Sequence, residues 1–223
     1  MSQMPFLLLS PTRFELTLIV SHLRNRKLEG ACVQVCGFGA VAAAARTSLL
    51  IARNRPKTVF LAGIAGSFDA QCSVGDAYEF HQVRSYGIGA GEGQQYRSAE
   101  ELGWKHVDEE ADTIPYGVGD VIRRVNEIEK QGNQSEPKGE LLSVCAASSS
   151  KLEADLKKTR YPEALAEDME GFAVAAACVM HSVPWVIVRG ISNRVGDRDR
   201  KNWQVERALK KTAEHVDRIL ADI

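Results

Sequence analysis

Short apolar runs alternate with segments of helical periodicity along the first two thirds of the chain. Buried strands are predicted where mainly apolar runs of four to six residues are bounded by turn residues, at 6–9, 31–36 and 58–63. A helix is predicted from about residue 12, because apolar side chains recur there every three or four positions. An alanine-rich segment predicts a second helix at about 40–53. Alternating strands, glycine turns and helices are typical of an α/β sheet with helices on both faces.

The remaining pattern extends the same architecture. Further strands are predicted at 74–83, 141–147 and 184–192, and further helices at 117–130, 169–180 and about 203–221, where Trp203 belongs to an apolar stripe. The glycine-rich segment 85–98 is predicted to be a loop, and 131–139 an exposed turn. No repeat or linker divides the chain, so a single domain spanning 1–223 is expected.

Composition and charge narrow the class of partner. With 44% hydrophobic residues the chain can build a core, which excludes a disordered or fibrous protein. Lys and Arg number 28 against 29 Asp and Glu, and this balance provides no basic excess for nucleic acid or an anionic membrane. The partner is expected to be a small molecule. The apolar run at 6–9 is too short for a signal peptide or membrane span, which predicts a cytoplasmic protein, and the His and Cys spacings predict no metal site.

A charged residue interrupts the apolar strand predicted at 184–192. Arg189 lies in the middle of PWVIVRGIS, where a buried charge is costly unless it is paired with a carboxylate or a bound anion. A structural ion pair is one interpretation. The other is a pocket, because Ser192 and Asn193 follow at the carboxyl end of the strand, where α/β sheets bind ligands.

Carboxylates and glycines mark three further places. Asp168 and Glu170 precede a helix, where they either favour the helix dipole or face a pocket and accept hydrogen bonds from two sugar hydroxyls. Met169 between them would supply an apolar wall. Gly63 and Ile64 follow a buried strand at a corner where the backbone could approach a ligand closely.

Two features are ambiguous when taken alone. Glu15 would be a solvated helix residue by its local sequence. The Gly37-Phe38-Gly39 turn suggests dinucleotide binding, but Ala42 stands where the third glycine of that fingerprint belongs, so no cofactor is expected.

Taken together, these motifs resemble the purine nucleoside phosphorylase and nucleosidase superfamily over essentially the whole chain. The resemblance is carried by VFLAGIAGSFD, SVGD and above all EDMEGFAVAAACVMHSVPWVIVRGISN. The continuation RGISNRVGDRDRKNW is most similar to the futalosine hydrolases, which remove hypoxanthine from futalosine in one route to menaquinone. The resemblance implies a three-layer α/β/α fold with a central mixed, partly barrel-like sheet. It also implies a homo-oligomer, a dimer or larger.

The resemblance also implies roles for individual residues. Glu15 would activate water, Met169 and Glu170 would pack on the ribose and hold its hydroxyls, and Arg189 would order the water and the catalytic carboxylate. Asn193 would take the base-recognition position. The base pocket would include Ala147 and Ser148, with a main-chain carbonyl near 146–148 as a candidate acceptor for the purine N1–H.

Chemistry at position 193 favours a 6-oxopurine. Breaking an N-glycosidic bond leaves negative charge on the departing base, which the enzyme must stabilise. The related adenosine-type nucleosidases carry Asp where this chain has Asn193. An amide NH2 donates to a 6-oxo group, whereas a carboxylate repels it. The sequence therefore favours hypoxanthine or guanine over adenine.

The nucleophile is predicted to be water. The superfamily's phosphorylases bind phosphate through an arginine and a hydroxyl at the positions of Leu61 and Ile64, and neither residue donates to an anion. The benzoate of futalosine requires a basic partner, for which the sequence leaves Arg13, Arg84, Arg97 and Arg198 open. The charged run 194–200 is either a solvated turn or a lid.

Three alternatives stay open. The chain could be a 6-oxopurine nucleoside phosphorylase, a methylthioadenosine/S-adenosylhomocysteine-type nucleosidase, or a non-catalytic nucleoside-binding protein. Asn193 disfavours the second, and the combination of Glu15 with Arg189 disfavours the third, because binding alone needs no group that activates water.

Overall fold

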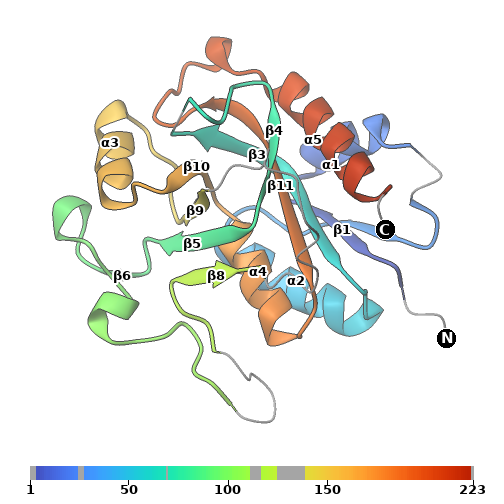
Figure 1. The fold of residues 1–223 in the computed structure, drawn as a ribbon, viewed down its shortest axis with the longest axis horizontal. Coiled ribbons are helices and arrows are strands. Elements are labelled where there is room, and N and C mark those ends of the chain that lie inside the picture. Colours follow the sequence, from blue (N-terminus) through green and yellow to red (C-terminus); the bar gives the residue numbers. More distant parts are fainter. Residues whose placement is uncertain (1–3, 25–27, 69, 111–116, 125–138, 222–223) are drawn as a thin grey trace, which may run out of the picture.

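One mixed sheet forms the centre of the molecule (Figure 1). The computed structural model describes residues 4–24, 28–68, 70–110, 117–124 and 139–221. Four strands run parallel in the order β2, β1, β3, β11, and their bounds are Cys32–Val35, Leu7–Ser10, Val59–Ser67 and Trp185–Arg194. The short strand β4 (Ala77–Phe80) pairs antiparallel with β11.

Strand β3 branches the sheet. Its first residues pair with β1, whereas Gly66 and Ser67 at its end pair antiparallel with β10 (Ala164–Asp168). From β10 the sheet continues through β9 (Glu140–Val144), β5 (Gln82–Tyr86) and β8 (Val121–Arg123). Because β3 exchanges one neighbour for another, the carboxyl ends of β1 and β3 diverge and leave space between them.

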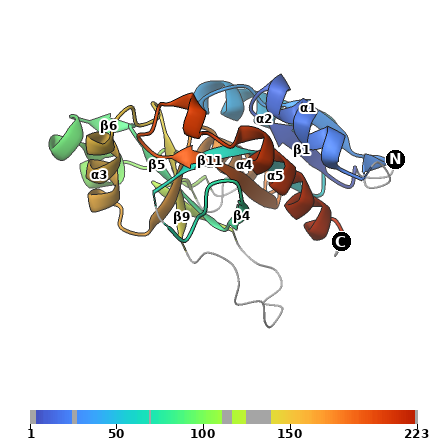
Figure 2. The ribbon, with the colours of Figure 1, turned by 90° about the horizontal axis from the view of Figure 1, so that it is seen from above.

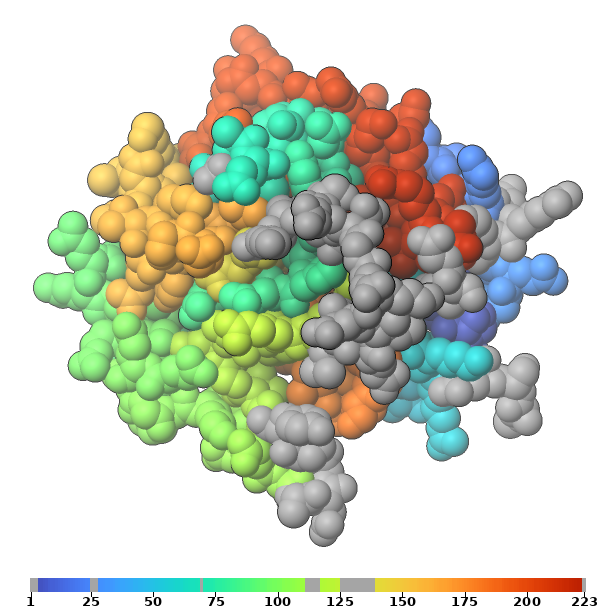
Figure 3. Space-filling model, viewed as in Figure 1, coloured from blue at the N-terminus to red at the C-terminus, as the bar shows by residue number. Residues whose placement is uncertain are grey.

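Helices cover both faces of the sheet. α2 (Ala40–Asn54) packs against α4 (Gly171–Met180) on one face, and α1 (Arg13–His22) packs against α5 (Val205–Ile219) on the other. The chain's first and last helices therefore lie side by side (Figure 2), and blue and red residues from the two ends of the chain meet at one side of the space-filling view (Figure 3). The predicted three-layer arrangement around a mixed sheet is confirmed.

Alternating residues of each strand supply the two cores. Leu7 and Leu9 of β1 belong to the core under α2 and α4, and Leu8 between them belongs to the core under α1 and α5. This period of two is what a strand covered on both faces requires, and it explains why the sequence shows unbroken apolar runs there.

Several predicted elements differ from the structure. The segment 74–83 contains two strands, because β4 ends at Phe80 and β5 begins at Gln82. The predicted loop 85–98 contains the end of β5 and a small hairpin of β6 (Gly89–Ala90) and β7 (Arg97–Ser98).

The helix predicted at 117–130 is wrong where the structure describes it. Residues 121–123 form β8, whose backbone pairs with β5 and so overrides the local helical pattern. Residues 125–138, which hold the rest of that segment and nearly all of the turn predicted at 131–139, lie outside the described residues.

Two further elements were not predicted. α3 (Lys151–Arg160) and β10 lie between residues 148 and 168, where no strand or helix was expected. Within the described part of the chain, no helix is both long and apolar enough to cross a membrane.

Candidate active site

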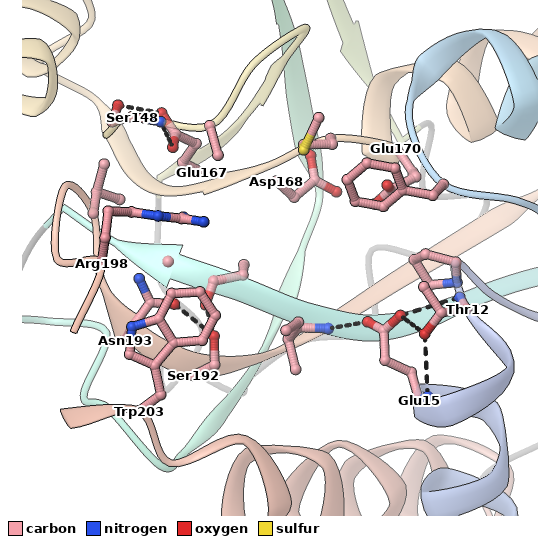
Figure 4. Close-up of a pocket in the computed structure, with 18 of the residues that line it drawn as sticks. Thr12, Glu15, Ser148, Glu167, Asp168, Glu170, Ser192, Asn193, Arg198 and Trp203 are labelled. Carbon is pink, nitrogen blue, oxygen red and sulfur yellow. Dashed lines mark hydrogen bonds between the residues drawn. The ribbon is translucent and has the colours of Figure 1, made fainter. Parts of the chain in front are cut away.

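A cavity of about 320 Å³ opens at the carboxyl ends of the strands. Its lining comes from segments that follow β1, β2 and β9, from the carboxyl-terminal halves of β3 and β10, and from the end of β11 and the segment after it (Figure 4). Seven residues predicted for the site line it: Glu15, Ile64, Ala147, Ser148, Met169, Glu170 and Asn193. Gly63 and Arg189 were also predicted but do not line the cavity. Gly63 lies next to Glu15, and Arg189 contacts Asp168 and Glu170, and all three of these carboxylates line it.

Glu15 is buried at the start of α1. Thr12 caps the helix, and its backbone N–H and side-chain hydroxyl both donate to Glu15 Oε2, at 3.1 and 2.6 Å. The backbone N–H of Ile64 donates to Oε1 at 3.0 Å (Figure 4). The carboxylate is therefore fixed by donors from two elements, and the solvated side chain that the local sequence suggested is wrong, since only 5% of Glu15 is exposed.

Gly63 gives Glu15 and Arg189 room to approach each other. A methyl group at position 63 would collide with Arg189 Nη1 and would lie 2.9 Å from Glu15 Oε1. The two side chains therefore flank the same point of β3. The close approach that the sequence suggested for a ligand is made here by two charged side chains.

Arg189 is fully buried and paired with two carboxylates. Its Nε donates to Asp168 Oδ2 at 3.0 Å, and Nη2 donates to Asp168 and, at 3.3 Å, to Glu170 Oε2. Burial alone would lower the pKa of Arg189, but Asp168 and Glu170 raise it. The ion pair proposed as a structural alternative is thus present, and it is also part of the pocket wall, because Asp168 and Glu170 line the cavity. Among the described residues Nη1 has no hydrogen-bond partner.

Asp168 organises the turn from β10 into α4. Its Oδ1 accepts from Ser143 Oγ at 2.5 Å, and its Oδ2 accepts from the backbone N–H of Gly171 at 2.8 Å. The carboxylate thereby holds the first turn of α4 and Arg189 together, which sets the position of Glu170 between them.

Glu170 bridges two segments of the pocket. Its Oε1 accepts from the backbone N–H of Gly39 at 2.9 Å, and its Oε2 accepts from Arg189. Burial raises the pKa of Glu170 to about 7, with Arg189 opposing the rise and Asp168 adding to it. Each oxygen retains a lone pair for a ligand hydroxyl.

The glycine turn at 37–39 donates a backbone hydrogen bond to the carboxylate of Glu170. Gly39, whose φ of 80° lies in the left-handed region, is the residue before α2, and its N–H is directed at Glu170. The turn that resembled part of a dinucleotide fingerprint therefore binds a side chain of the same protein.

Asn193 lies at the opposite end of the cavity from Glu15. Its Oδ1 accepts from Ser192 Oγ at 2.7 Å, and its Nδ2 donates to the carbonyls of Arg194 at 2.7 Å and Asp197 at 3.4 Å. The oxygen keeps one lone pair, and the hydrogen directed at Asp197 makes only a long contact. These hydrogen bonds fix the orientation of the amide. Oδ1 can still accept a hydrogen bond from a ligand, and the Nδ2 hydrogen that makes the long contact can still donate one.

Glu167 and Lys157 form a buried unit that the sequence did not suggest. Glu167 accepts from the backbone N–H and hydroxyl of Ser148, at 2.7 and 2.8 Å, and from Lys157 Nζ at 2.7 Å. Lys157 also donates to the carbonyl of Ala146 at 3.2 Å. The segment 146–148 is therefore anchored to β10 and α3, and the carbonyl of Ala146 already accepts one hydrogen bond.

The mouth of the cavity is aromatic and basic. Phe14, Phe38 and Trp203 contribute rings, and Arg198 and Arg200 contribute the cations. Trp203 precedes α5, so its predicted place on the stripe of that helix is wrong. Of the four arginines considered for an anionic tail, only Arg198 lines the cavity. Arg84 is paired with Glu140 at 2.7 Å, Arg97 donates to the carbonyl of Glu101, and Arg13 is not part of the lining.

Comparisons with known proteins place this arrangement in a family. The sequence profile of the phosphorylase superfamily matches residues 22–222. The chain belongs to the phosphorylase superfamily. This confirms the resemblance drawn from its motifs.

Relatives within the phosphorylase superfamily are nucleosidases. Futalosine hydrolase of Streptomyces coelicolor is 30% identical over 200 residues, which cover 87% of this chain and 80% of the relative. The 5′-methylthioadenosine/S-adenosylhomocysteine nucleosidase of Chromohalobacter salexigens is 27% identical over 217 residues, covering 90% and 88%. Both are hydrolases of N-glycosyl compounds, and the predicted enzyme class is confirmed at that level.

A solved structure shares the fold. The methylthioadenosine/S-adenosylhomocysteine nucleosidase of Colwellia psychrerythraea, in complex with adenine, superposes with a TM-score of 0.75 at 21% identity, covering 99% of this chain and 96% of that one. At this identity the likeness establishes the architecture.

Proposed function

We propose that this protein hydrolyses the N-glycosidic bond of a 6-oxopurine nucleoside and releases hypoxanthine from futalosine, a step of menaquinone biosynthesis. The observation that carries the proposal is the oriented amide of Asn193 in a pocket whose other end holds the buried carboxylates of Glu15 and Glu170. The futalosine hydrolase relative at 30% identity supports the substrate.

Glu15 is the proposed general base. Oε2 already accepts two hydrogen bonds from Thr12, whereas Oε1 accepts one from Ile64 and keeps a lone pair. A water molecule bound to Oε1 would give its proton to Glu15 as its oxygen attacks C1′ of the ribose. The C1′–N9 bond breaks in the same step, and its electron pair remains on the purine.

Glu170 and Arg189 are the proposed ribose-binding pair. Each oxygen of Glu170 has one lone pair free of Gly39 and Arg189, which matches the two neighbouring hydroxyls of a ribose. Met169 lies beside Glu170 in the lining and would pack on the sugar. Arg189 keeps Glu170 in place, so its proposed contribution is positioning.

The 6-oxopurine is proposed to lie against Asn193 and the segment 147–148. The Nδ2 hydrogen that makes the 3.4 Å contact with Asp197 is available to O6 or N7 of the base. This assignment makes Asn193 a residue that discriminates between bases.

A second cavity, which shares Phe14, Ile64, Arg200 and Trp203 with the first, offers a place for the tail of futalosine. Arg207 also lines it, together with one carboxylate, Glu206. An aromatic ring bearing a carboxylate matches walls made of Phe14 and Trp203 with Arg200 at their edge. A methylthio group would leave these arginines without a partner.

Water is the proposed nucleophile. Leu61 is buried within β3 and Ile64 presents a branched apolar side chain to the cavity, so the side chains at these two positions donate no hydrogen bond to phosphate. The second candidate is a methylthioadenosine/S-adenosylhomocysteine nucleosidase, which the relative from Chromohalobacter salexigens supports.

A homo-oligomer is also proposed. Phe14, Phe38 and Val41 are large exposed apolar side chains on or next to the cavity mouth, and a second copy of the chain would cover them.

Chromatographic detection of base release tests the function. Purified protein is incubated with futalosine, inosine, adenosine and methylthioadenosine, each with and without phosphate. Hypoxanthine released from futalosine in the absence of phosphate is the expected result. Adenine released from methylthioadenosine would favour the second candidate, and release only with phosphate would make the protein a phosphorylase.

A further inference from the structure

Among the described residues that line the base end of the cavity, no acid is free to give the base a proton. Asn193 is an uncharged amide, and its strongest donor contact is already directed at the carbonyl of Arg194. Glu167 accepts three hydrogen bonds, from Ser148 and from the ammonium group of Lys157, so both of its oxygens serve as acceptors. The departing 6-oxopurine carries negative charge, and a hydrolase must stabilise that charge at this end of the pocket.

Arg198 supplies a positive charge there. Its guanidinium lies 5.1 Å from the centre of the Trp203 ring, and Figure 4 shows it on the same side of the pocket as Asn193. Arg198 lines the cavity, and its guanidinium group offers several hydrogen-bond donors and a positive charge.

The carboxylates nearest in sequence do not neutralise Arg198. Asp197 accepts from the backbone N–H of Asp199 at 2.9 Å and from Asn202 Nδ2 at 3.0 Å. Asp199 accepts from the backbone N–H of Lys201 at 3.1 Å. In the part of the chain that the structure describes, no carboxylate lies within ion-pair distance of Arg198, which leaves its charge for a ligand.

The backbone fixes Arg198 relative to Asn193. The carbonyl of Asp197 accepts from Asn193 Nδ2 at 3.4 Å and from Trp203 Nε1 at 3.1 Å. Arg198 is the next residue, and it stacks on the same Trp203. The Asn193 amide and the Trp203 indole thus donate to the same carbonyl, and the guanidinium of the next residue lies over that indole. These contacts place the positive charge of Arg198 near the base end of the site.

Resting on the proposed function, we propose that Arg198 is a catalytic residue that stabilises the negative charge developing on the leaving 6-oxopurine. As C1′–N9 breaks, its electron pair passes into the purine ring, and the guanidinium donates hydrogen bonds to O6 or N7 without giving up a proton. The base then takes a proton from solvent, and Glu15 returns to solvent the proton that it took from water. Asn193 selects the base, and Arg198 makes it a better leaving group.

Methylation of the purine at N7 distinguishes stabilisation of the leaving base by Arg198 from a contact with the tail carboxylate and from a structural role. An N7-methylated purine is cationic before the bond breaks and leaves as a neutral base, so it needs no external positive charge. Arg198→Met, which keeps length and removes charge, is compared with wild type on futalosine, on its uncharged benzamide analogue and on N7-methylfutalosine. Inosine and N7-methylinosine provide the same comparison without a tail.

The expected result is a loss in kcat/KM of about 10²-fold or more on futalosine and on the benzamide, with less than about fivefold loss on the N7-methyl derivative. Arg198→Lys should recover part of the loss. Arg53→Met, an exposed arginine of α2 far from the cavity lining, is the matched control and should retain wild-type rates on all substrates.

Three outcomes would overturn the proposal. A fall in kcat/KM on futalosine and its N7-methyl derivative, without a fall on the benzamide, would show that Arg198 contacts the tail carboxylate. Equal loss on all substrates would make it a structural residue, and no loss would leave it without a role. If the wild-type protein releases no base from any nucleoside, the proposed function itself fails, and that result is visible before any variant is made.

Discussion

The carboxylate of Glu15 accepts a hydrogen bond from the backbone N–H of Ile64, a residue 49 positions later in the chain. Here the main chain of that residue, rather than its side chain, holds the carboxylate, and the isoleucine side chain remains free to pack. The contact joins the start of α1 to the end of β3 and fixes one wall of the cavity.

Replacing Glu15 by Gln should abolish most of the activity. The amide cannot take a proton from water, so kcat is expected to fall about 10²–10⁴-fold. Gln also presents an NH2 group where Thr12 donates, and the free energy of unfolding should fall by about 1 kcal/mol. Steady-state kinetics and urea unfolding measure the two effects.

Glu153→Gln is the matched control for this variant. Glu153 occupies the same position in α3 that Glu15 occupies in α1, three residues after a capping Ser, but it is exposed and outside the cavity. Glu153→Gln should lower the free energy of unfolding and leave kcat unchanged. Turnover of Glu15→Gln within about threefold of wild type would remove Glu15 as the general base.

Gly63→Ala should damage catalysis through Arg189 and Glu15 together. The new methyl group collides with Arg189 Nη1 and crowds Glu15 Oε1, so both charged groups must shift. A displacement of about 1 Å costs about 10²-fold in kcat/KM, and crowding in a packed interior costs about 1–3 kcal/mol of stability.

Gly66→Ala provides the comparison three residues further along β3. Its methyl group would meet Val195 Cγ2 at 3.1 Å and would make an ordinary van der Waals contact with the uncharged Nδ2 of Asn193 at 3.5 Å, and neither Glu15 nor Arg189 is among its nearest neighbours. The loss in kcat/KM should stay below about fivefold. Equal losses in the two variants would show that the effect of Gly63→Ala does not depend on its contact with Arg189 and Glu15.

Asn193→Asp should change base preference. One oxygen of the new carboxylate would face the carbonyls of Arg194 and Asp197, where the amide donates now, and O6 of the base would lose its donor. We expect kcat/KM for hypoxanthine nucleosides to fall by about 10–10²-fold and the adenosine-to-inosine ratio to rise. Asn54→Asp loses a similar bond to the carbonyl of Leu50, away from the cavity, and should leave that ratio unchanged.

Glu170 should make stability depend on pH. Burial raises the pKa of Glu170 from its ordinary 4.5 to about 7, so the folded protein holds a proton that the unfolded chain has lost between these values. The favourable contribution is complete below pH 4.5 and is lost as the pH rises through 7. Urea unfolding of wild type and Glu170→Gln isolates it, because the other groups titrate in both proteins. The difference in unfolding free energy, wild type minus variant, should fall between pH 5 and pH 8, and a constant or rising difference would contradict the assignment.

The sequence predicts the fold best where burial is two-sided. β1, β3 and β11 are covered by helices on both faces, so their apolar runs reveal them directly. β10 is equally buried but reads ALAED, and its strand geometry follows from pairing with β9 and β3 on either side. Neither of these partners can be inferred from local composition.

The sequence predicts site residues where a charged residue stands within or next to an apolar strand or helix. Arg189 stands out within an apolar strand, and Asp168 and Glu170 stand out before an apolar helix. Lys157 gives no such signal, because an exposed helix with the sequence KLEADLKKTR has the same composition as one that buries a single lysine against Glu167. Glu167 gives no such signal either, because its neighbour Asp168 is also acidic and ALAED shows no alternation of apolar and polar residues.

The hydrogen bond from Gly39 to Glu170 also bears on which substrates are refused. The start of a helix is a common landing place for phosphate groups, because its free N–H groups and dipole attract negative charge. In this protein the residue before α2 gives its N–H to a carboxylate from the opposite side of the pocket, so the anion at that helix start is built in. Under the proposed function Glu170 faces the two neighbouring ribose hydroxyls, so a phosphate group on either hydroxyl would meet an acidic side chain at this helix start. The turn would then disfavour nucleotides phosphorylated at those positions.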